Sequence, residues 1–150
     1  MYAFSLKLNQ CNIDYFHFLD SKSNLIMEGI FTKLMYALPS YTINSIYIEF
    51  PIANPVSHIK NFIVFDPVKD KPLFNLFRKL EIDILNNYAS LRNHAKKPNY
   101  SISNMFSYGR TKFFNPETVQ IFLLKISGVW ESETEYGITF KVVDASQIPM

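Results

Sequence analysis

Cysteine is nearly absent from this chain of 150 residues, in which Cys11 stands alone. A single cysteine cannot form an internal disulfide, and a zinc site made of several cysteines is excluded. No window of about 18 apolar residues occurs, and the first residues lack the basic segment and apolar stretch of a secretion signal. We therefore expect an intracellular protein of the cytoplasm, the nucleus or a viral replication site, which is neither secreted nor embedded in a membrane.

Motifs of enzyme chemistry are also missing. The chain has only four glycines, and none forms a phosphate-binding loop or a G-x-S-x-G turn. Its three histidines, His17, His58 and His94, are far apart, and Glu133 and Glu135 lie in a polar segment typical of an exposed turn. We therefore predict a protein that is not an enzyme, with no catalytic residue, metal, cofactor or small-molecule substrate.

Aromatic residues are abundant instead, with 14 Phe and 9 Tyr among an aromatic share of 16%. Hydrophobic residues make up 48% of the chain, which is enough for a core without disulfides. The length fits one domain over residues 1–150. A core absorbs much of the aromatic excess, and a stacking surface is a natural place for the rest.

The hydrophobic pattern is mostly that of strands. Alternating or dense apolar residues predict strands over residues 2–8, 13–19, 25–38, 42–50, 62–65, 118–130 and 136–143, with polar turns at 20–24 and 131–135. Residues 73–91 instead repeat apolar side chains every three or four positions, which predicts one helix that begins near Pro72. Residues 93–116 are polar and irregular. This order predicts a mainly β protein, an elaborated OB-fold-like five-stranded barrel with one helix and extra N-terminal strands.

A basic and aromatic stretch spans residues 84–116, where there is no Asp or Glu. Its positive charges are Arg92, Lys96, Lys97, Arg110 and Lys112. Its aromatic residues are Tyr88, Tyr100, Phe106, Tyr108, Phe113 and Phe114. Cations neutralise phosphates and aromatic faces stack on unpaired bases, so the mixture favours binding of single-stranded nucleic acid. The alternative is a solvated loop whose aromatic side chains fold back onto the core, as we expect for Tyr88.

The last predicted hairpin carries a second candidate surface. We expect Lys125 and Lys141 on one face of the two predicted strands, where they either reach the backbone of a bound nucleic acid or are simply solvated. Trp130, the only tryptophan, either stacks on a base or packs at the end of the barrel. Lys33, Tyr36 and Tyr47 lie in earlier predicted strands, where periodicity does not decide between a binding groove and the core.

Two segments resemble a known family. The segment LLKISGVWESETEYGITFKVVDA is similar to the last two strands of OB-fold single-stranded-DNA-binding proteins from large DNA viruses and phages. Its matching positions are Gly128, Trp130, Tyr136, Gly137, Thr139 and Lys141. The segment MEGIFTKLMYALPSYTINSIYIEF resembles an earlier hairpin of such proteins at Gly29, Phe31, Lys33, Tyr36 and Tyr47. The resemblance implies a viral protein that binds single-stranded DNA.

We therefore predict a largely sequence-independent single-stranded DNA-binding protein of DNA replication, recombination or repair. Phosphate contacts are expected from Lys33, Arg92, Lys96, Lys97, Arg110, Lys112, Lys125 and Lys141. Stacking is expected from Tyr100, Phe106, Tyr108 and Trp130. Two alternatives stay open, an RNA-binding domain and a structural or assembly protein that forms homo-oligomers through aromatic surfaces. DNA is favoured over RNA as the partner.

Overall fold

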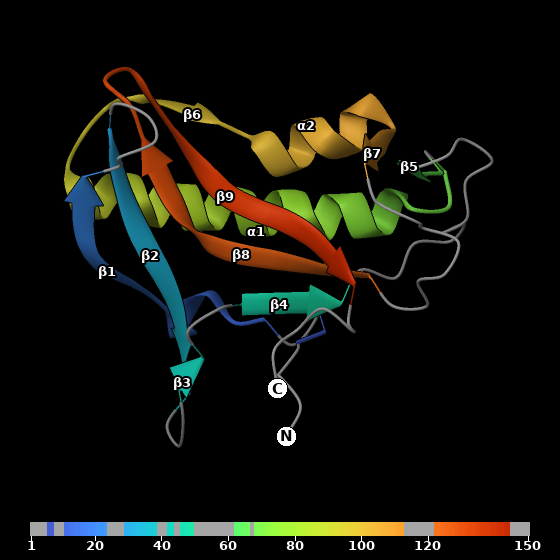
Figure 1. Cartoon of the computed structure of the whole chain (residues 1–150), viewed down its shortest axis with the longest axis horizontal. Coiled ribbons are helices and arrows are strands. Elements are labelled where there is room, and N and C mark those ends of the chain that lie inside the picture. The colour runs from blue at the N-terminus through green and yellow to red at the C-terminus, as the bar shows by residue number, and fades with distance from the viewer. Residues whose placement is uncertain are drawn as a thin grey trace.

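The computed structural model describes residues 6–7, 11–23, 29–38, 42–43, 46–49, 62–66, 68–112 and 122–144 (Figure 1). Within these ranges a short 3-10 helix, Ile13–Tyr15, precedes the strands. The strands are β1 (Phe16–Ser23), β2 (Ile30–Ala37), β3 (Thr42–Ile43), β4 (Ile46–Glu49), β5 (Phe62–Val64), β6 (Lys97–Asn99), β7 (Arg110–Lys112), β8 (Phe122–Glu131) and β9 (Glu135–Asp144). The helices are α1 (Lys71–Arg92) and α2 (Ser101–Tyr108).

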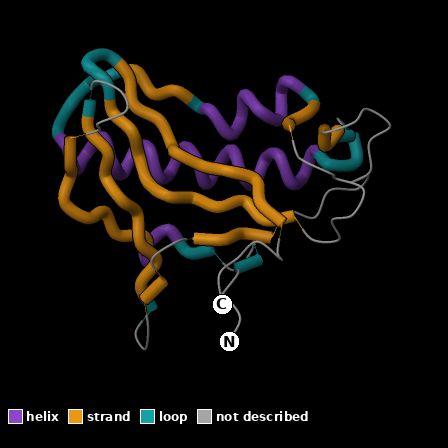
Figure 2. Tube along the Cα trace, in the orientation of Figure 1, coloured by secondary structure: helices purple, strands orange, loops and turns teal. Residues whose placement is uncertain are grey.

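The main sheet has the strand order β1-β2-β8-β9-β6, with β3 paired to β2 and β4 paired to β8 (Figure 2). Its pairs are antiparallel except for β6, which runs parallel to β9. A small separate sheet joins β5 to β7. The protein is therefore mainly β with a mixed sheet, as the sequence predicts in outline. The described strands form an open sheet with β1 and β6 at its edges, and they do not close into the expected barrel.

Helix α1 confirms the helix predicted from the three- and four-residue spacing. Pro72 lies in its first turn, and the helix ends where Asn93 adopts a left-handed conformation with φ of 52°. Its buried side packs on the sheet through Phe77, Leu80, Ile84, Leu85 and Tyr88. Tyr88 is therefore a core residue, as expected. In Figure 1, β8 and β9 pass in front of α1, so the helix covers one face of the main sheet.

Residues 93–112 are not the irregular loop that the sequence suggests. They contain β6, α2 and β7, so the described part of the chain has two α-helices instead of one. Helix α2 buries Ile102 and Phe106, four positions apart, against α1. The buried carboxylate of Glu81 on α1 accepts hydrogen bonds from the backbone N–H groups of Ile102 at 2.7 Å and Ser103 at 2.9 Å. Helix α2 has only eight residues, so its apolar side chains do not repeat often enough to predict a helix from the sequence. The carboxylate that stabilises its first turn is distant in sequence.

Several strand boundaries also differ from expectation. Strand β1 continues through the predicted turn as far as Ser23, with an irregularity between Phe18 and Ser21. The turn of the last hairpin is shorter than predicted, because Glu131 ends β8 and Glu135 begins β9. Of the predicted strand over residues 2–8, the structure describes only 6–7, where Leu6 forms a parallel bridge to Ile48. Phe113 and Phe114 lie outside the described residues.

Candidate nucleic-acid interface

The register of the main sheet separates its two faces. Side chains of a strand alternate between faces, and directly opposed residues share one face. Leu34, Ile48, Ile126 and Ile138 belong to the core beneath α1, so their neighbours along each strand point to the other side. We call that other side the outer face. Its charged and aromatic residues are His17, Lys22, Phe31, Lys33, Tyr47, Glu49, Lys97, Lys125, Trp130, Glu135 and Lys141.

One row across the outer face combines two lysines with a tyrosine. Tyr47 on β4 is opposite Lys125 on β8, which is opposite Lys141 on β9. The Lys125 Nζ atom lies 5.9 Å from the centre of the Tyr47 ring, within reach of a cation–π interaction. Lys141 is exposed, whereas Lys125 and Tyr47 are half-buried. Two ammonium groups and an aromatic ring thus lie side by side over three strands.

A second part of the outer face surrounds Trp130. Phe31 on β2 is opposite Trp130 on β8, which is opposite Gly137 on β9. A methyl group on Gly137 would lie 2.8 Å from Cζ2 of the indole, so the absence of a side chain makes room for the ring. Trp130 is half-buried in this position. The indole therefore lies against the neighbouring strand and keeps part of its surface in contact with solvent.

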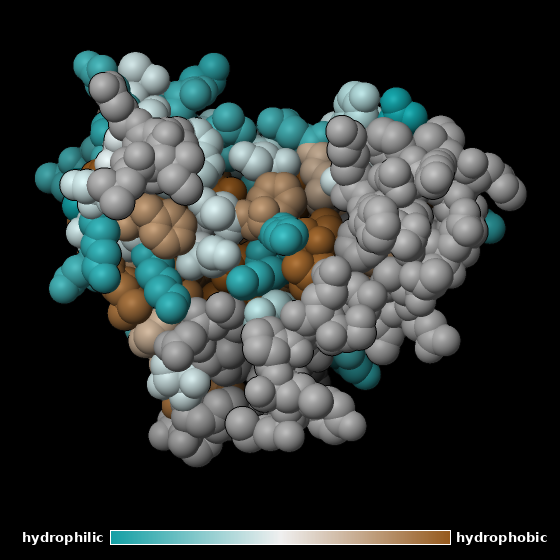
Figure 3. Space-filling view, in the orientation of Figure 1, coloured by the Kyte–Doolittle hydropathy of each residue, from teal (hydrophilic) through white to brown (hydrophobic). Residues whose placement is uncertain are grey.

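Two further lysines flank these aromatic residues. Lys33 is exposed and lies opposite Gly128, and exposed Lys22 lies opposite Phe31. The acidic side chains Glu49 and Glu135 lie at opposite ends of the β8–β9 ladder. Figure 3 looks onto the outer face, where hydrophilic and hydrophobic side chains alternate over the central strands. The middle of the outer face is therefore positively charged and partly aromatic.

One end of the outer face is apolar. Leu123 and Val143 form a cross-strand pair there and are only 1% and 8% exposed, although neither belongs to the main core cluster. This end is therefore not accessible to a ligand. The accessible region runs from the Tyr47–Lys125–Lys141 row to the Phe31–Trp130 pair.

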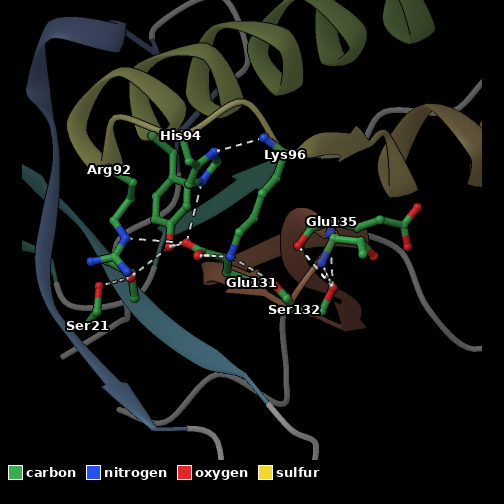
Figure 4. A network of polar contacts seen from close by, with 10 residues as sticks. Ser21, Arg92, His94, Lys96, Glu131, Ser132 and Glu135 are labelled. Atoms are coloured by element: carbon green, nitrogen blue, oxygen red, sulfur yellow. Dashed lines mark hydrogen bonds and ion pairs between the residues drawn. The ribbon is translucent and has the colours of Figure 1, made fainter.

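Arg92 and Lys96 lie on the helix side, where they neutralise a buried carboxylate instead of facing a phosphate. The Glu131 side chain is 3% exposed, and its Oε1 accepts a 2.7 Å hydrogen bond from the Tyr88 hydroxyl and a 3.3 Å bond from Nε of Arg92 (Figure 4). Lys96 donates to Oε2 of Glu131 and to the carbonyl oxygen of Ser132. Both cations are therefore paired with Glu131 and lie away from the outer face.

The electrostatics of this cluster favour the charged form of Glu131. Burial by itself raises the pKa of a carboxyl group. The hydrogen bonds from Lys96 and Tyr88, together with the charges of Lys96 and Arg92, outweigh burial and hold the pKa of Glu131 below its ordinary value. Nε2 of His94 lies 3.5 Å from the same carboxylate. The cluster joins the end of α1 to the β8–β9 turn.

The remaining predicted residues are spread over the helix side and the edge of the sheet. Phe106 is 5% exposed and stacks on Phe74 with 4.4 Å between ring centres, so no base can reach it. Tyr100 is half-buried against the core, whereas Tyr108 is 71% exposed, with Arg110 lying 5.7 Å from its ring centre. Lys97 is exposed on the edge strand β6, where it lies opposite Glu135 at the margin of the outer face. Lys112 ends β7, and its side chain lies outside the described part of the structure.

The structure thus brings together Lys33, Lys125, Trp130 and Lys141, and it adds Lys22, Phe31 and Tyr47 to them. The sequence does not indicate Lys22, because its segment has the composition of a turn and an irregularity in β1 interrupts the alternation typical of a strand. Glu131 was missed because it begins a run of acidic residues that resembles an exposed turn. Glu131 lies two positions after core residue Val129 in a strand, and this spacing predicts that both side chains point to the core.

Comparison of the chain with protein-family models, curated proteins and solved structures found no match. Among the described residues, no group of three or more His, Cys, Asp or Glu side chains is arranged to hold a metal ion. The helices of the described part are too short or too polar to cross a membrane.

Proposed function

We propose that this protein binds single-stranded nucleic acid on the outer face of its main sheet, without strong sequence preference. The observation that carries this proposal is the row formed by Tyr47, Lys125 and Lys141, because it places two like charges directly opposite each other beside an aromatic ring. Like charges in this position destabilise a sheet. A polyanion that lies across the row removes that repulsion.

The binding mechanism combines charge neutralisation with stacking. Lys33, Lys125 and Lys141 would contact phosphates and release counterions, which makes the affinity fall steeply with salt. Trp130, Phe31 and Tyr47 offer ring surface to unpaired bases, and such stacking contributes about 1–3 kcal/mol per base. Bases paired in a duplex cannot reach these rings. The outer face therefore suits a single strand better than double-stranded DNA.

The resemblance to OB-fold single-stranded-DNA-binding proteins of viruses and phages supports the same proposal. The two resembling segments are distant in sequence, yet β2 and β8 pair directly through Phe31 with Trp130 and Lys33 with Gly128. Of the aromatic and basic matching positions, Phe31, Lys33, Tyr47, Trp130 and Lys141 lie on the outer face, whereas Tyr36 and Tyr136 are buried in the core. We extend the proposal to an OB-like ancestry of this open sheet and to a role in DNA replication, recombination or repair.

Fluorescence anisotropy of a labelled oligo(dT) of about 30 nucleotides, titrated at several salt concentrations, tests the proposal. We expect binding that weakens steeply with salt and that duplex DNA competes for poorly. Preference for oligo(U) would replace DNA by RNA as the partner. Absence of binding to either strand at low salt would refute the proposal and leave the assembly protein as the better account.

Charge reversal locates the binding surface. Lys141→Glu on the outer face should weaken oligo(dT) binding about tenfold and reduce the slope of affinity against salt. Lys79→Glu is the matched control, because Lys79 is an exposed lysine on α1, on the opposite side of the sheet. Equal losses from the two variants would mean that net charge alone drives binding and would exclude the outer face as the site.

A further inference from the structure

A groove of about 630 Å³ lies between α1 and α2, on the helix side of the molecule. This volume is within the range of small-molecule sites, about 300–1,000 Å³. Its α1 wall presents Lys71, Asn75 and Arg78, which follow each other at spacings of four and three and therefore share one face of the helix. All three side chains are exposed. One side of the groove is thus formed by two cations with an amide between them.

The opposite wall is polar and uncharged. Ser103, Asn104 and Ser107 on α2 line it, and the Ser103 hydroxyl is oriented by a 2.7 Å hydrogen bond to Glu81. Three aromatic residues line the groove: the half-buried Phe74 and Tyr100, and the buried Phe106, which stacks on Phe74. The described lining residues include Lys71 and Arg78 but no Asp or Glu. Positive charge here is not neutralised by a carboxylate within the groove.

We propose that this groove binds a nucleoside monophosphate group. An arginine and a lysine on one wall match a phosphate, which Arg78 can hold through two parallel hydrogen bonds. The half-buried rings of Phe74 and Tyr100 offer surface to a nucleobase, and the amides of Asn75 and Asn104 can donate to and accept from the edge of the nucleobase. The groove thus offers cations to the phosphate, aromatic rings to the face of the nucleobase and amides to its edge.

This site is separate from the outer face, because none of the residues of the Tyr47–Lys125–Lys141 row or the Phe31–Trp130 pair lines the groove. It also departs from the sequence-based expectation of a chain without small-molecule ligands. The nucleotide can come from either of two sources, a free mononucleotide or the terminal nucleotide of a strand with a 5′-phosphate. Both present the same chemistry to Lys71 and Arg78.

Titration of the full chain with AMP, adenosine and inorganic phosphate, followed by backbone amide NMR, tests this inference. We expect AMP to shift the amide resonances of residues 71–78 and 100–107, with adenosine and phosphate each binding at least about tenfold more weakly. A 5′-phosphorylated oligonucleotide that shifts the same resonances more than its unphosphorylated form identifies the strand end as the source. No shift in these segments up to about 10 mM AMP overturns the inference.

Two charge reversals on adjacent residues provide the matched comparison. Arg78→Glu removes a lining cation and should weaken AMP binding about tenfold or more, whereas Lys79→Glu changes the net charge equally outside the groove and should have less than about a twofold effect. Equal effects would overturn the inference. Lys141→Glu should leave AMP binding unchanged, so failure of the outer-face proposal and failure of this one give different results.

Discussion

Lys125 and Lys141 lie directly opposite each other on β8 and β9, on the side of the sheet that α1 leaves uncovered. Neighbouring ammonium groups repel, and a cross-strand pair of like charges costs stability. Nothing in the fold requires a lysine at exposed Lys141. This repulsion is the reason that we propose an anionic partner lying across both strands.

Replacement of one member of this pair should separate stability from binding. We expect Lys141→Thr to raise the free energy of unfolding by up to about 1 kcal/mol at low salt, since it removes the repulsion and supplies a residue favoured in strands. The same variant should bind oligo(dT) several-fold more weakly. Urea unfolding and anisotropy measure the two effects. A variant that loses both stability and binding would contradict this explanation of the pair.

The contact between Trp130 and Gly137 predicts a strong effect of a single methyl group. Gly137→Ala places a Cβ atom 2.8–2.9 Å from two indole carbons and should destabilise the protein by roughly 1–3 kcal/mol while it displaces the ring. Tryptophan fluorescence reports the displacement, because Trp130 is the only tryptophan. Combining Gly137→Ala with Trp130→Leu should recover part of the lost stability. Additive losses in the double variant would show that the ring does not contact Gly137.

Glu131 should make stability fall on acidification. Its pKa is lower in the folded than in the unfolded state, so the stability it contributes is present above its ordinary pKa of 4.5 and is lost as pH falls through the lower folded value. We expect Glu131→Gln to cost roughly 1–3 kcal/mol at neutral pH, since Arg92 and Lys96 keep some contact with water. Its unfolding free energy should depend less on pH below about 5 than that of the parent protein. An unchanged acid profile would contradict this role.

Glu81 should act in the opposite direction. Burial raises its pKa, despite the hydrogen bonds from Ser103 and Ile102. The folded state therefore holds this proton more tightly, and the corresponding stability is present below the ordinary pKa of 4.5 and is lost as pH rises through the higher folded value. Glu81→Gln has no titratable group at this position and so loses no such contribution. Between about pH 4 and pH 7, the unfolding free energy of this variant should therefore increase more than that of the parent protein. Urea unfolding at several pH values measures it, and a smaller rise would contradict the raised pKa.

The parts of the fold that the sequence predicts well are those with a long, regular period. Helix α1 repeats apolar residues over many turns, and β9 alternates over most of its length, so both appear in the structure close to where the pattern places them. Helix α2 has only Ile102 and Phe106 as a buried pair, which is too little for a period to be recognised. The sequence predicts a barrel where the structure has an open sheet, because strand order along the chain does not reveal which strands pair.

The candidate site was predicted in part for a related reason. Lys33, Lys125, Trp130 and Lys141 were found because alternation or resemblance points to them, and they do share one face. Arg92 and Lys96 looked equally suitable, since a basic residue in an acid-free stretch has the same local pattern whether its partner is a phosphate or a distant carboxylate. Glu131, which is distant in sequence, decides their role, and only the folded structure brings it to them.

The pairing of β2 with β8 also has a kinetic consequence. The β1–β2 and β8–β9 pairs each join strands that are near in sequence, and such hairpins form within microseconds. The ladder from Ile30 with Glu131 to Lys33 with Gly128 instead closes a loop that includes both α-helices. Closure of a loop of this length is entropically costly and slows folding. We expect the β1–β2 and β8–β9 hairpins to form early in folding and the β2–β8 ladder to form in the rate-limiting step. The outer face is then the last part of the sheet to be completed.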